Sequence, residues 1–251
     1  MGVRLFNRTT RSVSLSEIGA EFVSTITPAL STIRVALEQA GNSQSAPSGT
    51  LRLNTSAGAA KQVMPLLLEY MRRYPQMKLD IVTEGRLVDI VAQGFDAGIR
   101  LGDSVPQDMI AVDISPPQRF AVLGSPAYFA SHPTPLSPLD LSAHECIRSR
   151  MPSGSIYRWE FERHGESIAV DVNGALTLDN PTLMLQAARA GMGLTYLTEW
   201  NAAADLAAGA LIRVLEEWTP TFDSLHLYYP GRRHVPAGLR ALIELIKERG
   251  F

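Results

Sequence analysis

The chain has 251 residues, a formal net charge of −2, 45% hydrophobic residues and 19% charged residues. This length accommodates one large domain or two lobes of roughly 100 residues each, with enough apolar content for a core. The charge excludes a general coating of nucleic acid, so any DNA contact must be local. One cysteine excludes an internal disulfide, and no signal peptide or apolar run of about 18 residues is found, which predicts a cytoplasmic protein.

Residues 1–12 (MGVRLFNRTTRS) combine three arginines with short polar side chains and contain no acid. This composition suits contacts to DNA phosphates, which position a protein without reading sequence. A solvated chain terminus has the same composition, so both readings stay open. The residues expected to contact a DNA backbone are Arg4, Asn7, Arg8, Thr9, Thr10 and Arg11.

A helix is expected from Ser16, its N-cap, to residue 41, because apolar residues recur at spacings of three and four over more than six turns. Such a stripe is buried either against a second copy of itself, as in a coiled coil, or against the protein's own body. Residues 42–49 (NSQSAPSG) then indicate a flexible hinge. The apolar positions expected at a dimer interface are Ile18, Phe22, Ile26, Ala29, Ile33 and Leu37.

The next segments alternate between strand and helix patterns. Strands are expected at 50–54, 77–83 and 95–101, with helices at 59–74 and 87–93 between them. This β-α-β-α-β order predicts an α/β fold with a mostly parallel sheet and helices on both faces. Two further strands, 110–114 and 119–123, are separated by Pro116-Pro117.

A second lobe is expected to begin at residue 124, where Gly124-Ser125-Pro126 breaks the pattern. It contains a strand at 146–148, a β-pair at 156–163 and 167–172 turned at His164-Gly165, and a strand at 194–197. Asp179-Asn180-Pro181, a capping Asp or Asn followed by proline at the first helical position, predicts a helix over 182–189, and another helix is expected at 201–208. A returning strand at 224–229 and a final helix at 236–247 complete the pattern.

Small residues connect the first strand of the body to its helix. The backbone N–H groups at the start of that helix form a potential anion site, in which Ser56 is an ordinary N-cap, a ligand contact, or both. Arg100 ends the third strand, and ligands of open α/β sheets bind beyond the carboxyl ends of strands. The alternative for Arg100 is an ion pair with a neighbouring carboxylate such as Asp103.

If the two lobes face each other, three arginines and a helix N-terminus favour a small carboxylate or another anion as ligand. Arg148 and Arg150 could instead be exposed on a strand edge. Tyr157 and Trp159 either wall the cleft or pack the β-pair. The residues expected to bind the effector are Thr55, Ser56, Ala57, Gly58, Arg100, Leu101, Gly102, Arg148, Arg150, Asn180 and Tyr196.

Four stretches occur in the order and spacing of a known family: GVRLFNRTTRSVSLSEIG, DIVAQGFDAGIRLG, FAVLGSPAYFASH and AARAGMGLTYL. Over its whole length the chain resembles LysR-type transcriptional regulators. The resemblance implies a wing (1–15), a linker helix that pairs two subunits (16–41), a hinge (42–49), and a two-lobed effector domain like type 2 periplasmic binding proteins. Its lobes would be residues 50–123 with 224–251, and residues 124–223.

By the same resemblance, an effector rearranges a homodimer or tetramer and so changes contacts with promoter DNA. The sequence begins at the wing, so most of the DNA-reading head is expected to be missing, and DNA is a partner only if that head is present. Two alternatives stay open. One is a stand-alone solute-binding protein of the same fold, and the other is a natural effector-binding, oligomerising fragment without operator binding.

Enzymatic chemistry is not expected. Gly191 and Gly193 resemble part of a dinucleotide loop, but they follow a helix rather than a strand. The chain has no G-x-S-x-G motif and no P-loop, and its five histidines show no metal-ligand spacing. The sequence therefore predicts no catalytic residue, no cofactor, no metal site and no membrane partner.

Overall fold

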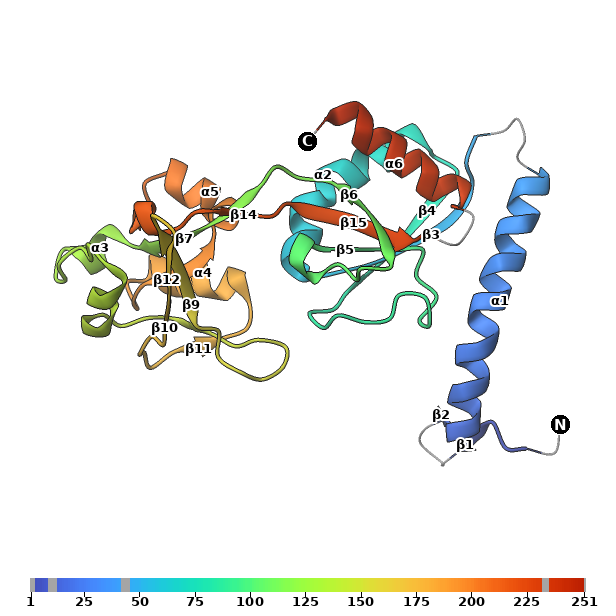
Figure 1. Cartoon of the computed structure of the whole chain (residues 1–251), viewed down its shortest axis with the longest axis horizontal. Helices are drawn as coiled ribbons and strands as arrows, with labels where there is room; N and C mark the ends of the chain where they lie inside the picture. Colours follow the sequence, from blue (N-terminus) through green and yellow to red (C-terminus); the bar gives the residue numbers. More distant parts are fainter. Residues whose placement is uncertain (1–2, 9–12, 42–45, 232–234, 251) are drawn as a thin grey trace. The chain divides into compact units, whose positions relative to one another are not determined.

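The computed structural model describes residues 3–8, 13–41, 46–231 and 235–250, and the chain divides into two compact units (Figure 1). Unit 1 comprises residues 1–114 and 226–251, and unit 2 comprises residues 115–225. The predicted lobe boundary at 123/124 is wrong, because strand β7 (Gln118–Gly124) pairs with three strands of unit 2. Among the described residues, no helix is long and apolar enough to cross a membrane.

The N-terminal segment is a hairpin followed by a long helix. Strands β1 (Phe6–Arg8) and β2 (Val13–Leu15) are antiparallel, and α1 spans Glu17–Gly41. The Ser16 hydroxyl accepts the Gly19 N–H at 3.0 Å, which confirms the predicted N-cap. A Cβ on Gly19 would lie 2.0 Å from the Leu5 carbonyl oxygen, so only glycine fits where the hairpin meets the helix.

Unit 1 contains a five-stranded sheet in the order β4-β3-β5-β15-β6. Strand β3 (Gly49–Thr55) is parallel to β4 (Met77–Thr83) and β5 (Ala97–Leu101), whereas β15 (Leu225–Pro230) is antiparallel to β6 (Met109–Asp113). Helices α2 (Ala57–Arg73) and α6 (Ala237–Arg249) lie side by side (Figure 1). The Tyr70 hydroxyl of α2 donates to the Gly238 carbonyl of α6 at 3.0 Å. A short helical turn, η1 (Gly102–Ser104), follows β5.

The predicted helix at 87–93 is wrong. This segment forms a single turn in which the Asp89 carboxylate accepts the N–H groups of Val91 and Ala92 at 2.9 and 3.0 Å, and Gly94 ends the turn with φ +72°. Seven residues rich in β-branched side chains rarely sustain a helix alone. Its apolar side chains instead pack on the sheet, where Ile90 and Phe95 contact Tyr228.

Unit 2 is built around β7, which is antiparallel to β12 (Thr195–Thr198), β13 (Ile212–Val214) and β14 (Thr221–Phe222). The sheet of this unit is therefore antiparallel, whereas the strands for which a parallel sheet was predicted, β3, β4 and β5, are parallel in unit 1. Strands β8 (Arg148–Ser149) and β11 (Thr177–Leu178) form a short parallel pair. The β9 (Trp159–Arg163) and β10 (Glu166–Val170) hairpin turns at His164 and Gly165, both at positive φ, as predicted.

The helical elements of unit 2 are α3 (Pro126–Phe129), η2 (Pro138–Ala143), α4 (Pro181–Arg189), α5 (Glu199–Ala207) and η3 (Glu216–Trp218). Residues of α4 and α5 share one buried cluster with Leu123, Ile147 and Leu197. A second buried cluster contains Trp159 and Tyr196. The sheet therefore has a core on each side.

Candidate functional site

The junction between β3 and α2 presents backbone donors at one edge of the unit 1 sheet. The Ser56 hydroxyl accepts the Ala59 N–H at 3.2 Å, so Ser56 is the N-cap of α2. Ala57 and Gly58 are the first two residues of the helix, and N–H groups at these positions have no acceptor within a helix. A Cβ on Gly58 would meet no described atom within 4 Å, so the space beside Gly58 in the first turn is open.

Arg100 lies at the same edge of the sheet. Thr55 is opposite Ile99 in the register of β3 and β5, so Ser56 and Arg100 are the next residues along neighbouring strands. Leu101 and Gly102 follow at the start of η1. The structure thus brings the predicted residues 55–58 and 100–102 together within unit 1.

The guanidinium of Arg100 is buried, with 7% of the residue exposed, and burial lowers its pKa. It does not form the ion pair with Asp103 that the sequence left open. Direct contact between Arg100 and an effector stays a prediction. The Arg100 guanidinium donates to four oxygens, and all four are neutral. They are the carbonyls of Ile99 (2.8 Å), Glu84 (3.1 Å) and Arg86 (3.1 Å), and Oδ1 of Asn54 (2.6 Å).

Two residues that the sequence did not single out complete this buried polar cluster. Asn54 is fully buried, and its Nδ2 has no hydrogen-bond partner among the described residues. Tyr228 is also fully buried, and its hydroxyl has no partner among the residues that the structure describes. Its ring lies over Gly98, where a Cβ would be 2.3 Å from Cζ. A polar asparagine next to the end of a core strand is the sequence signal that could have identified Asn54.

In unit 2, Arg148 and Asn180 belong to the short β8–β11 pair and the segment that follows it. Arg148 is opposite Thr177 in the parallel β8–β11 pair, and β11 leads directly to Asn180. Asn180 Oδ1 accepts the N–H groups of Thr182 (2.9 Å) and Leu183 (3.4 Å), so it caps α4 as predicted. Arg148 is half-buried and its Nε has no partner in the part of the chain that the structure describes.

Arg150 is exposed and donates to the Gly154 carbonyl at 3.3 Å. It therefore has the surface position that the sequence left open, from which a guanidinium is still accessible to a ligand.

Tyr196 has a role inside unit 2. It is 4% exposed, its hydroxyl donates to the Glu160 carbonyl at 2.5 Å, and its ring stacks on Phe120 at 4.5 Å. Trp159 also stacks on Tyr196, at 5.3 Å, and is fully buried, so it packs the β-pair. An effector contact by Tyr196 stays a prediction, and it requires a rearrangement of this aromatic core.

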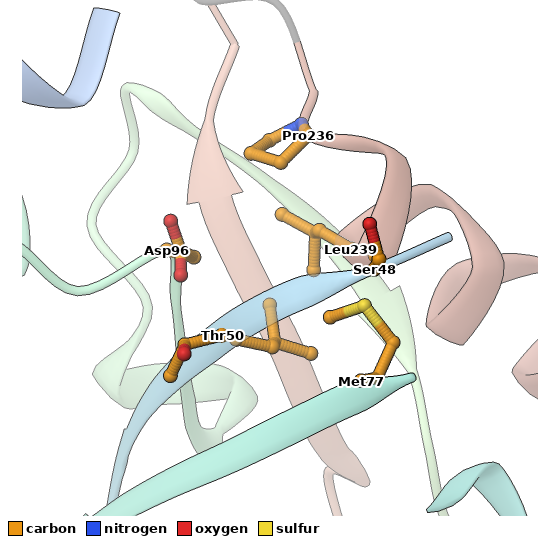
Figure 2. Close-up of a pocket in the computed structure, with 8 residues that line it drawn as sticks. Ser48, Thr50, Met77, Asp96, Pro236 and Leu239 are labelled. Atoms are coloured by element: carbon orange, nitrogen blue, oxygen red, sulfur yellow. The ribbon is translucent and has the colours of Figure 1, made fainter. Parts of the chain in front are cut away.

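Figure 2 shows a small cavity in unit 1 at the edge where β3 and β4 begin. Its volume of about 10 Å³ suffices for a single water molecule at most. The Asp96 carboxylate in its wall accepts the Arg52 N–H at 2.8 Å. This cavity is at the opposite end of β3 from Ser56, and none of its lining residues was predicted to bind an effector.

Comparison with known proteins assigns the chain to a family. The model of the LysR substrate binding domain matches residues 44–250. The chain belongs to the LysR family of transcriptional regulators. The uncharacterized HTH-type transcriptional regulator YcaN of Escherichia coli K12 is 40% identical over 246 residues, which cover 98% of this chain and 80% of that protein. The E. coli K12 regulator PgrR is 36% identical over 252 residues, covering 100% and 84%.

Solved structures of LysR-type regulators have the same fold. CrgA of Neisseria meningitidis is 27% identical with a TM-score of 0.71, covering all of this chain and 85% of that chain. Full-length AphB of Vibrio cholerae has a TM-score of 0.73 at 23% identity, covering 98% and 84%. The predicted α/β effector-domain fold, similar to type 2 periplasmic binding proteins, is confirmed.

The hairpin of this LysR-family chain corresponds to the predicted wing. Arg4 Nε donates to the Phe6 carbonyl at 2.9 Å, and Asn7 Nδ2 reaches the Leu15 carbonyl at 3.5 Å. Arg8 is exposed at the end of β1, and Thr9, Thr10 and Arg11 lie outside the described residues. Their contacts with DNA stay predictions.

Helix α1 presents much of its predicted apolar stripe to solvent in the single chain. Ile18 is 49% exposed and Ile33 is 56% exposed, which is high for isoleucine. Phe22 and Ile26 are half-buried, Ala29 is exposed, and the Leu37 side chain lies outside the described set. Dimerisation through this stripe stays a prediction.

Proposed function

We propose that this LysR-type regulator binds a small anionic effector and changes transcription in response. The effector contacts in unit 1 are the segment Thr55–Gly58, with Arg100, Leu101 and Gly102 beside it. In unit 2 they are Arg148, Arg150, Asn180 and Tyr196. The protein acts in the cytoplasm as a homodimer or tetramer paired through α1, and its wing contacts the phosphates of promoter DNA.

The observation that carries this proposal is the open N-terminus of α2. Helix α2 has 17 residues, so its macrodipole is fully developed; N–H groups in its first turn have no acceptor within the helix, and there is open space beside Gly58. Such a helix end binds carboxylate or phosphate oxygens without any further device. The neighbouring Arg100 adds positive charge at the same edge.

The exposed guanidinium of Arg150 in unit 2 supports the anionic character of the effector. Arg150 has one hydrogen bond to a carbonyl, at 3.3 Å, and the Nε of Arg148 has no partner among the described groups. Guanidinium groups bind carboxylates through two parallel hydrogen bonds, so the exposed guanidinium of Arg150 matches such a ligand.

Family membership supports a regulatory role over a stand-alone solute-binding protein. The two E. coli relatives are named transcriptional regulators of the HTH type, and they align with at least 98% of this chain. An effector can alter transcription only if it binds one conformational state of the regulator more tightly than another. Tenfold regulation requires about 1.4 kcal/mol of such preference.

The test is a thermal-shift screen of small anions, neutral molecules and cations against the purified protein, followed by calorimetry with the best ligand. We expect anions to stabilise the protein, and Gly58→Leu to weaken their binding at least tenfold, because the side chain fills the open space. Gln76→Leu, at the opposite edge of the sheet, is the control and should bind normally. Stabilisation by neutral or cationic compounds alone would refute the anionic effector.

A further inference from the structure

Arg100 is a buried cation without a carboxylate partner. We propose that Arg100 makes the site at the α2 N-terminus selective for anions through its electric field, without touching the effector. This inference rests on the proposed effector site and assigns one residue as the determinant of its charge preference. It replaces a contact role for Arg100 by an action at a distance.

The hydrogen bonds of Arg100 leave its charge uncompensated. Its guanidinium donates to Asn54 Oδ1 and to three main-chain carbonyls, and all of these oxygens are neutral. Within the described ranges it takes part in no ion pair. The Glu84 carboxylate acts on Arg100 only through longer-range attraction, and the Glu84 atom that accepts its hydrogen bond is the carbonyl oxygen.

Another arginine of the same chain shows the usual arrangement. Arg213 in unit 2 has a side chain that is only 10% exposed, and it pairs with Glu199 at 2.9 Å and with Glu216 at 3.5 Å. A buried charge is costly unless a countercharge accompanies it. Arg100 has the burial of Arg213 without its two carboxylates, so its charge remains available to an incoming anion.

The polar atoms around Arg100 indicate that this cluster is not optimised for stability. Asn54 Nδ2 and the Tyr228 hydroxyl are buried without partners among the described atoms, and each such group costs folding free energy. Natural proteins that leave buried polar groups without hydrogen bonds typically do so at functional sites. The cluster lies next to Ser56 in the strand register, so its field adds to the α2 dipole.

The hydrogen bond from Arg100 to Asn54 offers a way to cancel the charge of Arg100 without moving its guanidinium. Asn54→Asp places a carboxylate where Oδ1 now accepts the 2.6 Å hydrogen bond, and it removes the unpartnered Nδ2. Gln76→Glu makes the same change in net charge at the opposite edge of the sheet, just before β4 begins. The two variants therefore differ in the position of the added charge.

The experiment measures the binding of acetate, succinate, benzoate and sulfate, with acetamide, succinamide and benzamide as neutral counterparts, to the full chain by calorimetry. We expect Asn54→Asp to bind the anions about tenfold more weakly while its affinity for the amides stays within twofold, because a unit charge is cancelled near the site. Gln76→Glu should match the wild type. A second variant, Arg100→Gln, should show the same selective loss if it melts within a few degrees of wild type.

Each outcome separates this inference from the proposed function. If the wild type binds an anion of the panel and Asn54→Asp binds it equally well, the field role of Arg100 is wrong and the effector site stands. If Asn54→Asp weakens anions and amides alike, Asn54 and Arg100 only shape the site, and the inference is again overturned. If no anion binds the wild type, the proposed anionic effector fails, and the inference fails with it.

Discussion

Arg189 at the end of α4 and Asp205 in α5 form a two-pronged ion pair, with Arg189 Nε 2.5 Å from Asp205 Oδ1 and Arg189 Nη2 2.7 Å from Oδ2. The Asp205 side chain is 8% exposed, whereas that of Arg189 is 46% exposed. The pair therefore holds a buried carboxylate with a partly solvated cation and joins the two helices that cover one face of the unit 2 sheet.

Removing Arg189 should destabilise unit 2, because the Asp205 carboxylate would stay buried without its countercharge. We expect Arg189→Met to lower the free energy of unfolding by about 1–2 kcal/mol, discounted for the solvent exposure of Arg189. The measurement is urea denaturation followed by circular dichroism. Arg158→Met is the control, because Arg158 Nε is 3.6 Å from Asp171 Oδ2 and both side chains are well exposed. This variant should change the free energy of unfolding by less than about 0.5 kcal/mol. Equal losses in both variants would contradict this account.

Gly98 should not tolerate a side chain. A Cβ there would lie 2.3 Å from Cζ of Tyr228, which is fully buried and has no room to retreat. We expect Gly98→Ala to cost about 2–3 kcal/mol of stability through overpacking. Gly58→Ala is the matched control, because its Cβ meets no described atom within 4 Å and alanine favours the helix. Combining Gly98→Ala with Tyr228→Ala should cost at least about 1 kcal/mol less than the sum of the single changes.

Much of the fold follows from local signals in the sequence. Asn180 and Pro181 start α4 because an asparagine cap and a proline at the first helical position act within four residues. His164 and Gly165 turn the β9–β10 hairpin because both adopt positive φ. These devices need no knowledge of the rest of the chain.

The features that the sequence does not predict depend on distant partners. Asn54 and Arg100 are 46 residues apart, and only the register of β3 and β5 brings them together. The apolar spacing of 87–93 matches a helix, yet contacts with Tyr228, more than 130 positions later, hold it as a turn against the sheet. Tertiary packing overrides a short local pattern in such cases.

Unit 2 should lose stability as the pH falls toward 5.5. His144 is buried, and burial together with the nearby His132 lowers its pKa, while Asp140 opposes the shift. The Tyr128 hydroxyl accepts the Glu145 N–H at 3.1 Å and is hydrogen-bonded to His144 Nδ1, also at 3.1 Å, and placing a positive charge on this buried imidazole lowers the stability of the native state. The unfolded chain then binds more protons than the native state below the ordinary histidine pKa of about 6.5.

This stability is present above that pKa and is lost as the pH falls toward the lower native value. We therefore expect the melting temperature of the wild type to fall more steeply between pH 7.5 and 5.5 than that of His144→Asn, which keeps an acceptor for Tyr128. His164→Asn at the exposed hairpin turn is the control and should show the wild-type slope. An unchanged slope in His144→Asn would exclude His144 as the titrating group.

The apolar stripe of α1 should determine the oligomeric state. Ile18 and Ile33 are about half exposed in the single chain, although burying such side chains gives roughly 1.5–3 kcal/mol each. A two-fold interface uses each side chain twice, so one aspartate in the stripe introduces two unpaired charges. We expect Ile33→Asp to shift the mass in light scattering from that of an oligomer toward 27.4 kDa. Ser24→Asp, an equal charge change at an exposed polar position of the same helix, should leave the mass unchanged. An oligomer that persists in Ile33→Asp would place the interface outside this stripe, since the buried aspartates would not be tolerated within it.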